Sequence, residues 1–154
     1  MARIALVATL LLLGSFPGAA TADDHVAVSP DQLKWGPAPP SLPKGAQAAI
    51  VSGDPTKEGL YVLRLKVSSG YKVPPHVHPQ DENITVISGT FNIGMGDKFD
   101  DKKGTAVKAG GFAKAPKGMQ HYAYFTEDTI IQIHGLGPQG ITYVNPNDEP
   151  RKSN

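Results

Sequence analysis

Residues 70–89 read GYKVPPHVHPQDENITVISG, and this stretch decides the fold. His76 and His78 lie two positions apart, so in an extended strand both side chains leave the same face. Pro74 and Pro75 precede the pair and Pro79 follows it, which excludes a helix and favours an extended backbone. The spacing therefore predicts that two imidazoles converge on one point.

Glu82 opens the second half of this stretch. The run over residues 82–88 is rich in β-branched side chains and ends at Gly89, a turn residue. This pattern predicts a strand that folds back beside the first, so that the Glu82 carboxylate reaches the two imidazoles. Two imidazoles and one carboxylate held on strands suit a divalent transition metal.

Residues 1–22 have the pattern of a secretory signal peptide. Arg3 precedes an apolar run over residues 4–13, and the segment ends in the small-residue pattern Ala20-Thr21-Ala22. A buried core helix is the alternative, and the apolar run is too short to span a membrane. We expect cleavage after Ala22, a protein located in the periplasm or secreted, and no membrane insertion after cleavage.

The composition predicts one all-β domain. Removal of residues 1–22 leaves 132 of the 154 residues, enough for a single core. Lys and Arg number 15, one of them Arg3, against 14 Asp and Glu, a balance that argues against nucleic-acid or acidic-lipid partners. The chain has no cysteine, which excludes disulfides and thiolate ligands. Its 14 prolines and 17 glycines favour short strands joined by turns.

The predicted elements begin after a proline-rich arm. Residues 23–45 are expected to cross the body of the protein or a neighbouring subunit, with Trp35 and Leu42 as anchors, although residues 23–30 fit a disordered leader equally well. The charged loop over residues 97–103 lacks the order of a calcium loop and is expected to be solvated. Besides the histidine strand, strands are predicted over residues 47–52, 61–67, 82–88, 90–95, 105–108, 112–115, 121–125, 129–135 and 141–144.

A third histidine follows a predicted turn. Pro116-Lys117-Gly118 delivers His121 to the start of a strand in which His121, Ala123 and Phe125 share one face. If His121 points inward, Phe125 packs in the interior, and the two intervening tyrosines lie outside.

The two histidine-bearing stretches resemble the motifs of the cupins. The first cupin motif, Gly-(x)5-His-x-His-(x)3-4-Glu-(x)6-Gly, is matched by Gly70, His76, His78, Glu82 and Gly89. The second, Gly-(x)5-Pro-x-Gly-(x)2-His-(x)3-Asn, is matched by Gly110, Pro116, Gly118 and His121, with Phe125 in place of Asn. The arm around Trp35 and the run over residues 94–100 resemble those of small exported bacterial single-domain cupins.

The resemblance implies a single cupin jelly-roll, an antiparallel β-barrel over residues 46–145, followed by a tail over residues 146–154. It implies one divalent transition metal per chain, of the set Mn, Fe, Ni, Zn, Co or Cu, held by His76, His78, Glu82 and His121. Four protein ligands leave positions open for water, dioxygen or a chelating substrate. The resemblance also implies a homodimer that takes a small-molecule ligand or substrate.

Three classes of function stay open at this point. The first is a metal-dependent enzyme, such as an oxygenase, decarboxylase or isomerase, for which no catalytic residue beyond the ligands is evident. The second is a non-catalytic module that binds a metal or small ligand. The third is a metal-free interaction domain, disfavoured because all four ligands are present. Gln132 and His134 orient the ligand if they face inward, and lie on the surface if Ile131 and Ile133 face inward instead.

The predicted cleavage would create a second metal-binding group. A mature chain that starts Asp23-Asp24-His25 offers its amine, two backbone amides and the His25 imidazole to Cu(II) or Ni(II) in a square plane. We expect this terminus to bind Cu(II) if cleavage follows Ala22, and a chance histidine is the alternative.

Overall fold

The computed structural model describes residues 25–152. The predicted signal peptide and the first two residues of the predicted copper-binding terminus lie outside this range. Within it the chain forms eleven strands and three short 3-10 turns, η2 (Pro30–Gln32), η3 (Pro146–Asp148) and η4 (Pro150–Lys152), and no α-helix. The all-β prediction is confirmed. Over the same residues, no helix has the length and apolar character needed to cross a membrane.

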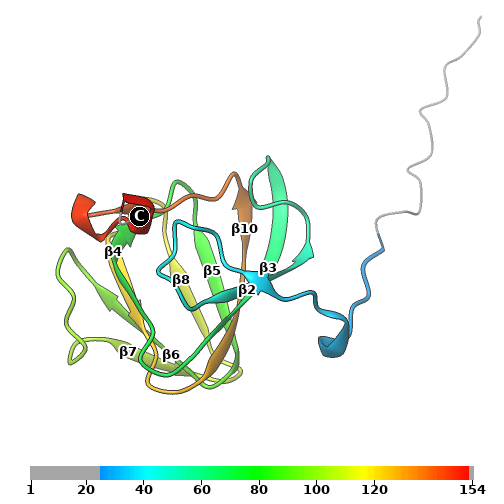
Figure 1. Cartoon of the computed structure of the whole chain (residues 1–154), viewed down its shortest axis with the longest axis horizontal. Coiled ribbons are helices and arrows are strands. Elements are labelled where there is room, and N and C mark those ends of the chain that lie inside the picture. Colours follow the sequence, from blue (N-terminus) through cyan, green and yellow to red (C-terminus); the bar gives the residue numbers. More distant parts are fainter. Residues whose placement is uncertain (1–24, 153–154) are drawn as a thin grey trace, which may run out of the picture.

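Six antiparallel strands form one sheet, in the order β1-β2-β3-β10-β5-β8. They are β1 (Gly36–Pro37), β2 (Gln47–Ser52), β3 (Gly59–Val67), β10 (Thr129–Gly137), β5 (Glu82–Ser88) and β8 (Phe112–Ala115) (Figure 1). The long central pair, β3 and β10, is in register over its whole length, from Thr129 opposite Val67 to Gly137 opposite Gly59.

Five antiparallel strands form the second sheet, in the order β11-β4-β9-β6-β7. They are β11 (Thr142–Tyr143), β4 (Lys72–Val77), β9 (His121–Tyr124), β6 (Thr90–Met95) and β7 (Thr105–Lys108). Both sheets end in short strands of two or four residues, β1 and β8 in one and β11 and β7 in the other. No strand of one sheet pairs with a strand of the other among the described residues, so the jelly-roll consists of two facing sheets and not of one continuous closed ladder.

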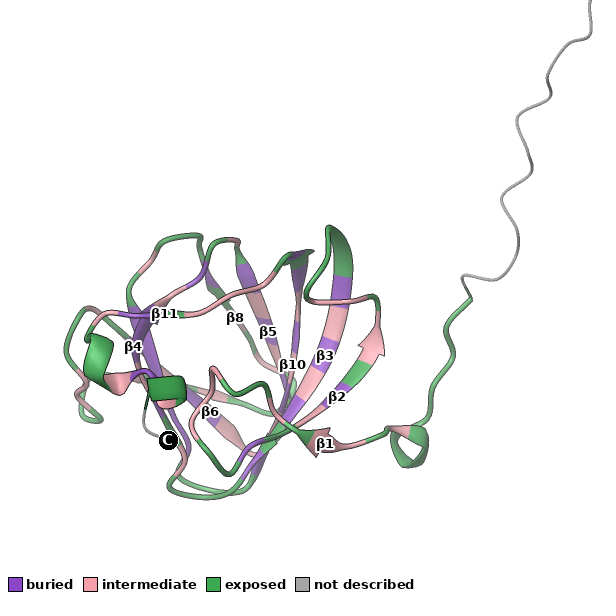
Figure 2. Cartoon of the chain, turned by 45° about the horizontal axis from the view of Figure 1, so that its top comes forward, coloured by how far each residue is buried: buried purple, intermediate pink, exposed green. Residues whose placement is uncertain are grey.

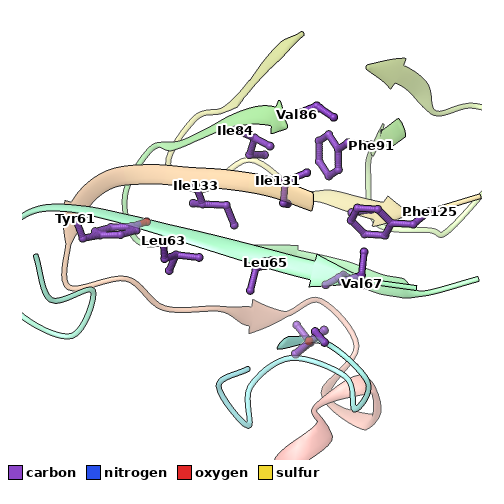
Figure 3. Close-up of a cluster of buried hydrophobic side chains, with 14 residues drawn as sticks. Tyr61, Leu63, Leu65, Val67, Ile84, Val86, Phe91, Phe125, Ile131 and Ile133 are labelled. Carbon is purple, nitrogen blue, oxygen red and sulfur yellow. The ribbon is translucent and has the colours of Figure 1, made fainter. Parts of the chain in front are cut away.

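The core lies between the two sheets. Alternate residues of β3, β5 and β10 point inward, among them Leu63, Ile84 and Ile133, as the period of two in these strands predicts (Figure 3). Phe125, which stands where the cupin motif has Asn, is buried in this core. Its ring contacts those of Phe91 and Tyr71, at centroid distances of 5.7 and 6.0 Å.

The predicted arm lies partly on its own barrel. Its Gly36 and Pro37 form β1 against β2, Leu42 packs on the core, and the Lys66 ammonium lies 4.8 Å from the centre of the Trp35 ring. The sequence left open whether the arm crosses the body of its own chain or a neighbouring subunit. Residues 36–43 lie across their own chain. The start of the described chain, with η2, projects away from the barrel (Figure 1).

The outer face of β9 is covered in a way that the sequence did not predict. Tyr122 and Tyr124 point away from the core but are buried, because the loop over residues 97–103 folds across them. Tyr122 donates a hydrogen bond to the Asp100 carbonyl and Tyr124 to that of Asp101, each at 2.7 Å. Phe99 packs on both rings, so this charged loop contributes a small apolar cluster of its own.

Candidate metal centre

Four polar side chains from three strands meet between the sheets. His76 belongs to β4 and His121 is the first residue of β9, while His78 follows the end of β4 and Glu82 begins β5. All four are buried, with 2–8% of each residue exposed. Since β4 and β9 lie in one sheet and β5 lies in the other, the group joins the two sheets.

The prolines of β4 shape this meeting point. His76 is paired directly with His121 of β9, and the register of the two strands shifts between Val73 and His76. Pro74 and Pro75 occupy the shift, where they lack the N–H groups that a regular ladder needs. The irregular pairing therefore sits immediately beside the two histidines.

The candidate ligand atoms are close together. Single ring nitrogens of His76, His78 and His121 all lie within 4.8 Å of one another. The Oε2 atom of Glu82 lies 3.4 Å from His78 Nε2 and 3.7 Å from His121 Nε2. The sequence-based expectation that three imidazoles and one carboxylate converge thus agrees with the structure.

Each imidazole is oriented by a backbone carbonyl. The Nδ1 atom of His76 donates to Pro74 O at 2.7 Å, that of His78 to Gly140 O at 2.6 Å, and that of His121 to Met119 O at 2.9 Å. A carbonyl oxygen only accepts, so each Nδ1 carries a hydrogen, and in the neutral ring each Nε2 keeps its lone pair. Hydrogen bonds of this kind fix the orientation of metal-binding histidines.

One of these nitrogens has no hydrogen-bond partner in the protein. His78 Nε2 is buried, and its 3.4 Å separation from Glu82 is longer than an ordinary N–H···O hydrogen bond. A buried polar atom without a partner costs stability, unless a bound group completes it. Three nitrogens and one carboxylate oxygen match the donors that divalent transition metals prefer, so these residues fit such an ion.

The charges of the four groups depend on one another. Burial, and then the nearby His121 and His78, lower the pKa of His76 to about 3, so its ring is neutral at physiological pH. Burial also opposes the charged form of His78, but the Glu82 carboxylate outweighs it and raises the pKa of His78. Although burial favours the protonated acid, the His78 and His121 rings hold the pKa of Glu82 well below its usual range. Glu82 is therefore a carboxylate.

The four groups line a cavity of about 300 Å³ between the sheets. This volume is at the lower end of the range for small-molecule sites. Most of the other lining side chains are aliphatic or aromatic, among them Leu63, Leu65, Ile84, Phe91, Phe125 and Ile131. The polar group thus opens onto an apolar space large enough for a small molecule.

Comparison with known proteins identifies the family. The family model of the ChrR cupin-like domain matches residues 23–139. The chain belongs to this cupin family.

Similar proteins share parts of this cupin or its fold. Germin-like protein subfamily 1 member 1 of Arabidopsis thaliana is 32% identical over 89 residues, which are 57% of this chain and 40% of that protein. The cupin therefore spans less than half of that relative. The polyketide cyclase RemF of Streptomyces resistomycificus is 16% identical, with a TM-score of 0.63, over 82% of this chain and 89% of that chain. An acetylacetone dioxygenase of Acinetobacter johnsonii is 14% identical, with a TM-score of 0.62, over 88% and 87%. At these identities, each of the two structures shows only that it shares its fold with this chain.

The structure decides between the two orientations considered for Gln132 and His134. Ile131 and Ile133 are buried in the core, so Gln132 and His134 lie on the outer face of β10. Gln132 accepts a hydrogen bond from Arg64 Nε at 3.1 Å on that face. Neither residue lines the cavity, so neither orients a ligand of the cupin there.

Sequence reasoning missed the residues that hold the ligands in place. Asp81 accepts a hydrogen bond from the Lys117 N–H at 2.8 Å, and the His78 carbonyl accepts one from the Gly118 N–H at 3.0 Å. These bonds fix the turn that carries the Met119 carbonyl. The spacing of the second motif marks this turn, but the contact of Gly140 with His78 spans 62 positions and leaves no local signal.

Proposed function

We propose that this cupin is a metal-dependent enzyme that acts on a small organic molecule in its cavity, as an oxygenase or a decarboxylase. One observation carries the proposal. The Nε2 sides of three carbonyl-oriented imidazoles and the Glu82 carboxylate meet at a buried point on the wall of an apolar cavity.

In this proposal, His76, His78 and His121 hold one divalent metal through Nε2, and Glu82 holds it through its carboxylate. When bound, such a metal supplies Lewis acidity and open positions for oxygen-bearing ligands. The carbonyls of Pro74, Met119 and Gly140 keep the imidazoles oriented. The apolar walls exclude water, which strengthens electrostatic interactions inside the cavity.

The kind of reaction is argued from the titratable groups. Besides the four candidate ligands, Tyr71 is the one titratable residue among the described residues that line the cavity. Its hydroxyl already donates to the Pro43 carbonyl at 2.7 Å, and burial raises its pKa. Reactions that need no separate protein acid or base are therefore favoured over hydrolysis. The acetylacetone dioxygenase that shares the fold makes small diketones the first substrates to test.

The test combines metal analysis with an activity screen. Protein purified from its native compartment is analysed for bound metals, and oxygen uptake and carbon dioxide release are then followed over a panel of small carboxylates, diketones and phenols. We expect about one metal per chain, and turnover that His76→Ala abolishes and His134→Ala preserves. Metal-free wild-type protein would contradict the proposed site.

The small number of acids and bases that line the cavity also favours a second function, which is binding without catalysis. A module that captures a metal or a small chelating ligand needs the four ligands and the cavity but no further reactive group. Stoichiometric metal and tight ligand binding, without turnover of any panel member, would favour this binding function over the enzyme.

We also propose that the cupin acts outside the cytoplasm as a homodimer. The support is the pattern of residues 1–22 and the exposed Val26 and Val28, at 53% and 40%, in the part of the arm that projects from the barrel. Intact-mass analysis should give a mature chain that starts at Asp23. Size exclusion with light scattering should give a dimer, and a monomer at all concentrations would contradict the proposed homodimer.

A further inference from the structure

Part of the N-terminal arm forms one wall of the cavity. Residues 39–43, here called the strap, follow β1, and three of them, Pro39, Ser41 and Leu42, line the same cavity as the four candidate ligands. Figure 2 shows the chain between β1 and β2 lying over the space between the two sheets. The strap starts from β1, at the edge of the six-stranded sheet, and covers the cavity between the sheets.

Two tyrosines of the opposite side hold the strap. Tyr143 of β11 donates a hydrogen bond to Ser41 O, and Tyr71, just before β4, donates one to Pro43 O, both at 2.7 Å. Burial raises the pKa of both hydroxyls, so both remain hydrogen-bond donors. Between these two bonds, Leu42 N donates to Pro39 O at 2.9 Å and closes a turn. The backbone on both sides of Leu42 is thus fixed, which fixes the direction of its side chain.

The strap is linked to the candidate ligands through Tyr143. This residue is paired with His76 across β11 and β4, and the two rings lie 6.0 Å apart between their centroids. The same aromatic ring therefore packs beside a candidate ligand while its hydroxyl holds Ser41. A molecule bound at the four ligands would lie within the space that the strap encloses.

We propose that the cavity selects a molecule with chelating oxygens on a compact apolar body, and that Leu42 sets the size of that body. The chelating part rests on the proposed function. The apolar part follows from the walls, because a polar body would lose its hydrogen bonds to water without replacement. The size limit follows from the strap, since the residues on either side of Leu42 are held by hydrogen bonds from Tyr143 of β11 and from Tyr71, just before β4.

The first test uses coloured iron complexes as probes. Purified protein is loaded with iron(III), desalted and titrated with catechol, 4-methylcatechol and 4-tert-butylcatechol, and the charge-transfer band in the visible gives each Kd. The readout is the ratio of the Kd values for the bulky and the small probe. Leu42→Ala should lower the Kd for 4-tert-butylcatechol relative to the Kd for catechol about tenfold, and Leu42→Trp should raise it.

Matched variants separate selection from general loosening. Leu33→Ala removes the other leucine of the arm, which does not line the cavity, and should leave the ratio unchanged. Tyr143→Phe and Tyr71→Phe keep the rings but free the strap, so the ratio should move toward that of Leu42→Ala. A ratio that is the same in wild type, Leu42→Ala and Leu42→Trp would overturn the role of Leu42, even if all three bind catechol.

A second test needs no metal. Benzene and tert-butylbenzene should raise the melting temperature of the metal-free protein by binding the native state, and Leu42→Ala should increase the shift from tert-butylbenzene relative to that from benzene. Absence of any catechol band in iron-loaded wild type would defeat the chelating part and the proposed function together. If the shift from tert-butylbenzene relative to that from benzene is the same in wild type and in Leu42→Ala, the size limit alone is wrong.

Discussion

The four buried polar residues destabilise the native state if nothing binds them. His76, His78, Glu82 and His121 take up interior space that apolar side chains could fill, and His78 Nε2 has no hydrogen-bond partner. Burying ionisable groups usually destabilises a protein unless they are fully paired. Departures of this kind from good packing are expected at functional sites, so these residues are the first to test.

Removing one imidazole should remove the metal. We expect His76→Ala and His121→Ala each to reduce bound metal to near zero, while circular dichroism shows an intact β-fold, because the apolar core does not depend on these rings. His134→Ala is the matched control, since this histidine lies on the outer face of β10. A His76→Ala, His121→Ala double variant with wild-type metal content would refute the assignment.

Metal affinity should fall in acid. The pKa of His78 lies above its usual value of 6.5, so below that pH a proton occupies Nε2 and must leave before a metal binds. The proton on His78 alone should lower the affinity about tenfold per pH unit below pH 6. His76, with its pKa near 3, does not compete in this range. Competition titrations from pH 8 to pH 5 measure the slope, and an affinity that is equal at pH 7 and pH 5 would contradict His78 as a ligand.

At the scale of elements, the contact between β6 and β9 includes an aromatic ring that lies directly over a glycine. Gly94 of β6 lies opposite Tyr122 of β9, and a Cβ atom there would overlap the Tyr122 ring. This ring is buried under the loop over residues 97–103 and held by Asp100 O, so it has little freedom to move.

Gly94→Ala should therefore destabilise the fold. Overpacking of this kind costs about 1–3 kcal/mol. Gly36→Ala is the matched control, because Gly36 also lies in a strand and has open space around its Cβ position. Urea unfolding of both variants gives the free energies. Equal midpoints for wild type and Gly94→Ala would show that the cover over β9 adapts to the added methyl group.

The elements could be predicted where the signal is local. Alternation in residues 61–67 marked β3, and the fixed spacing around His76 and His121 marked the candidate ligands, because both patterns span few residues. Contacts between distant segments leave no such pattern. The bond of His78 to Gly140, the cover of residues 97–103 over Tyr122, and the strap held by Tyr143 over 102 positions all depend on the completed fold.

At the scale of the whole molecule, the candidate site is a link between two separate sheets. Glu82 comes from the six-stranded sheet, and His76 and His121 come from the five-stranded sheet. A metal held by all of them would tie the sheets together in the native state. The unfolded chain does not keep the four groups together, so the metal should bind the native state far more tightly.

Metal should therefore raise the melting temperature. Free metal at a hundredfold excess over its Kd stabilises the native state by about 2.7 kcal/mol. Calorimetry of the metal-free and metal-loaded forms measures the shift, and His76→Ala should not show it. A metal-free form that is unfolded at 25 °C would contradict the independence of the apolar core.

The measurement that tests the metal site most directly is anomalous diffraction from crystals of the metal-loaded protein, recorded at the absorption edge of the bound metal. The account predicts one peak per chain at about 2.0–2.2 Å from the Nε2 atoms of His76, His78 and His121 and from a carboxylate oxygen of Glu82. No peak between these four side chains, or a peak at the amino terminus alone, would contradict it.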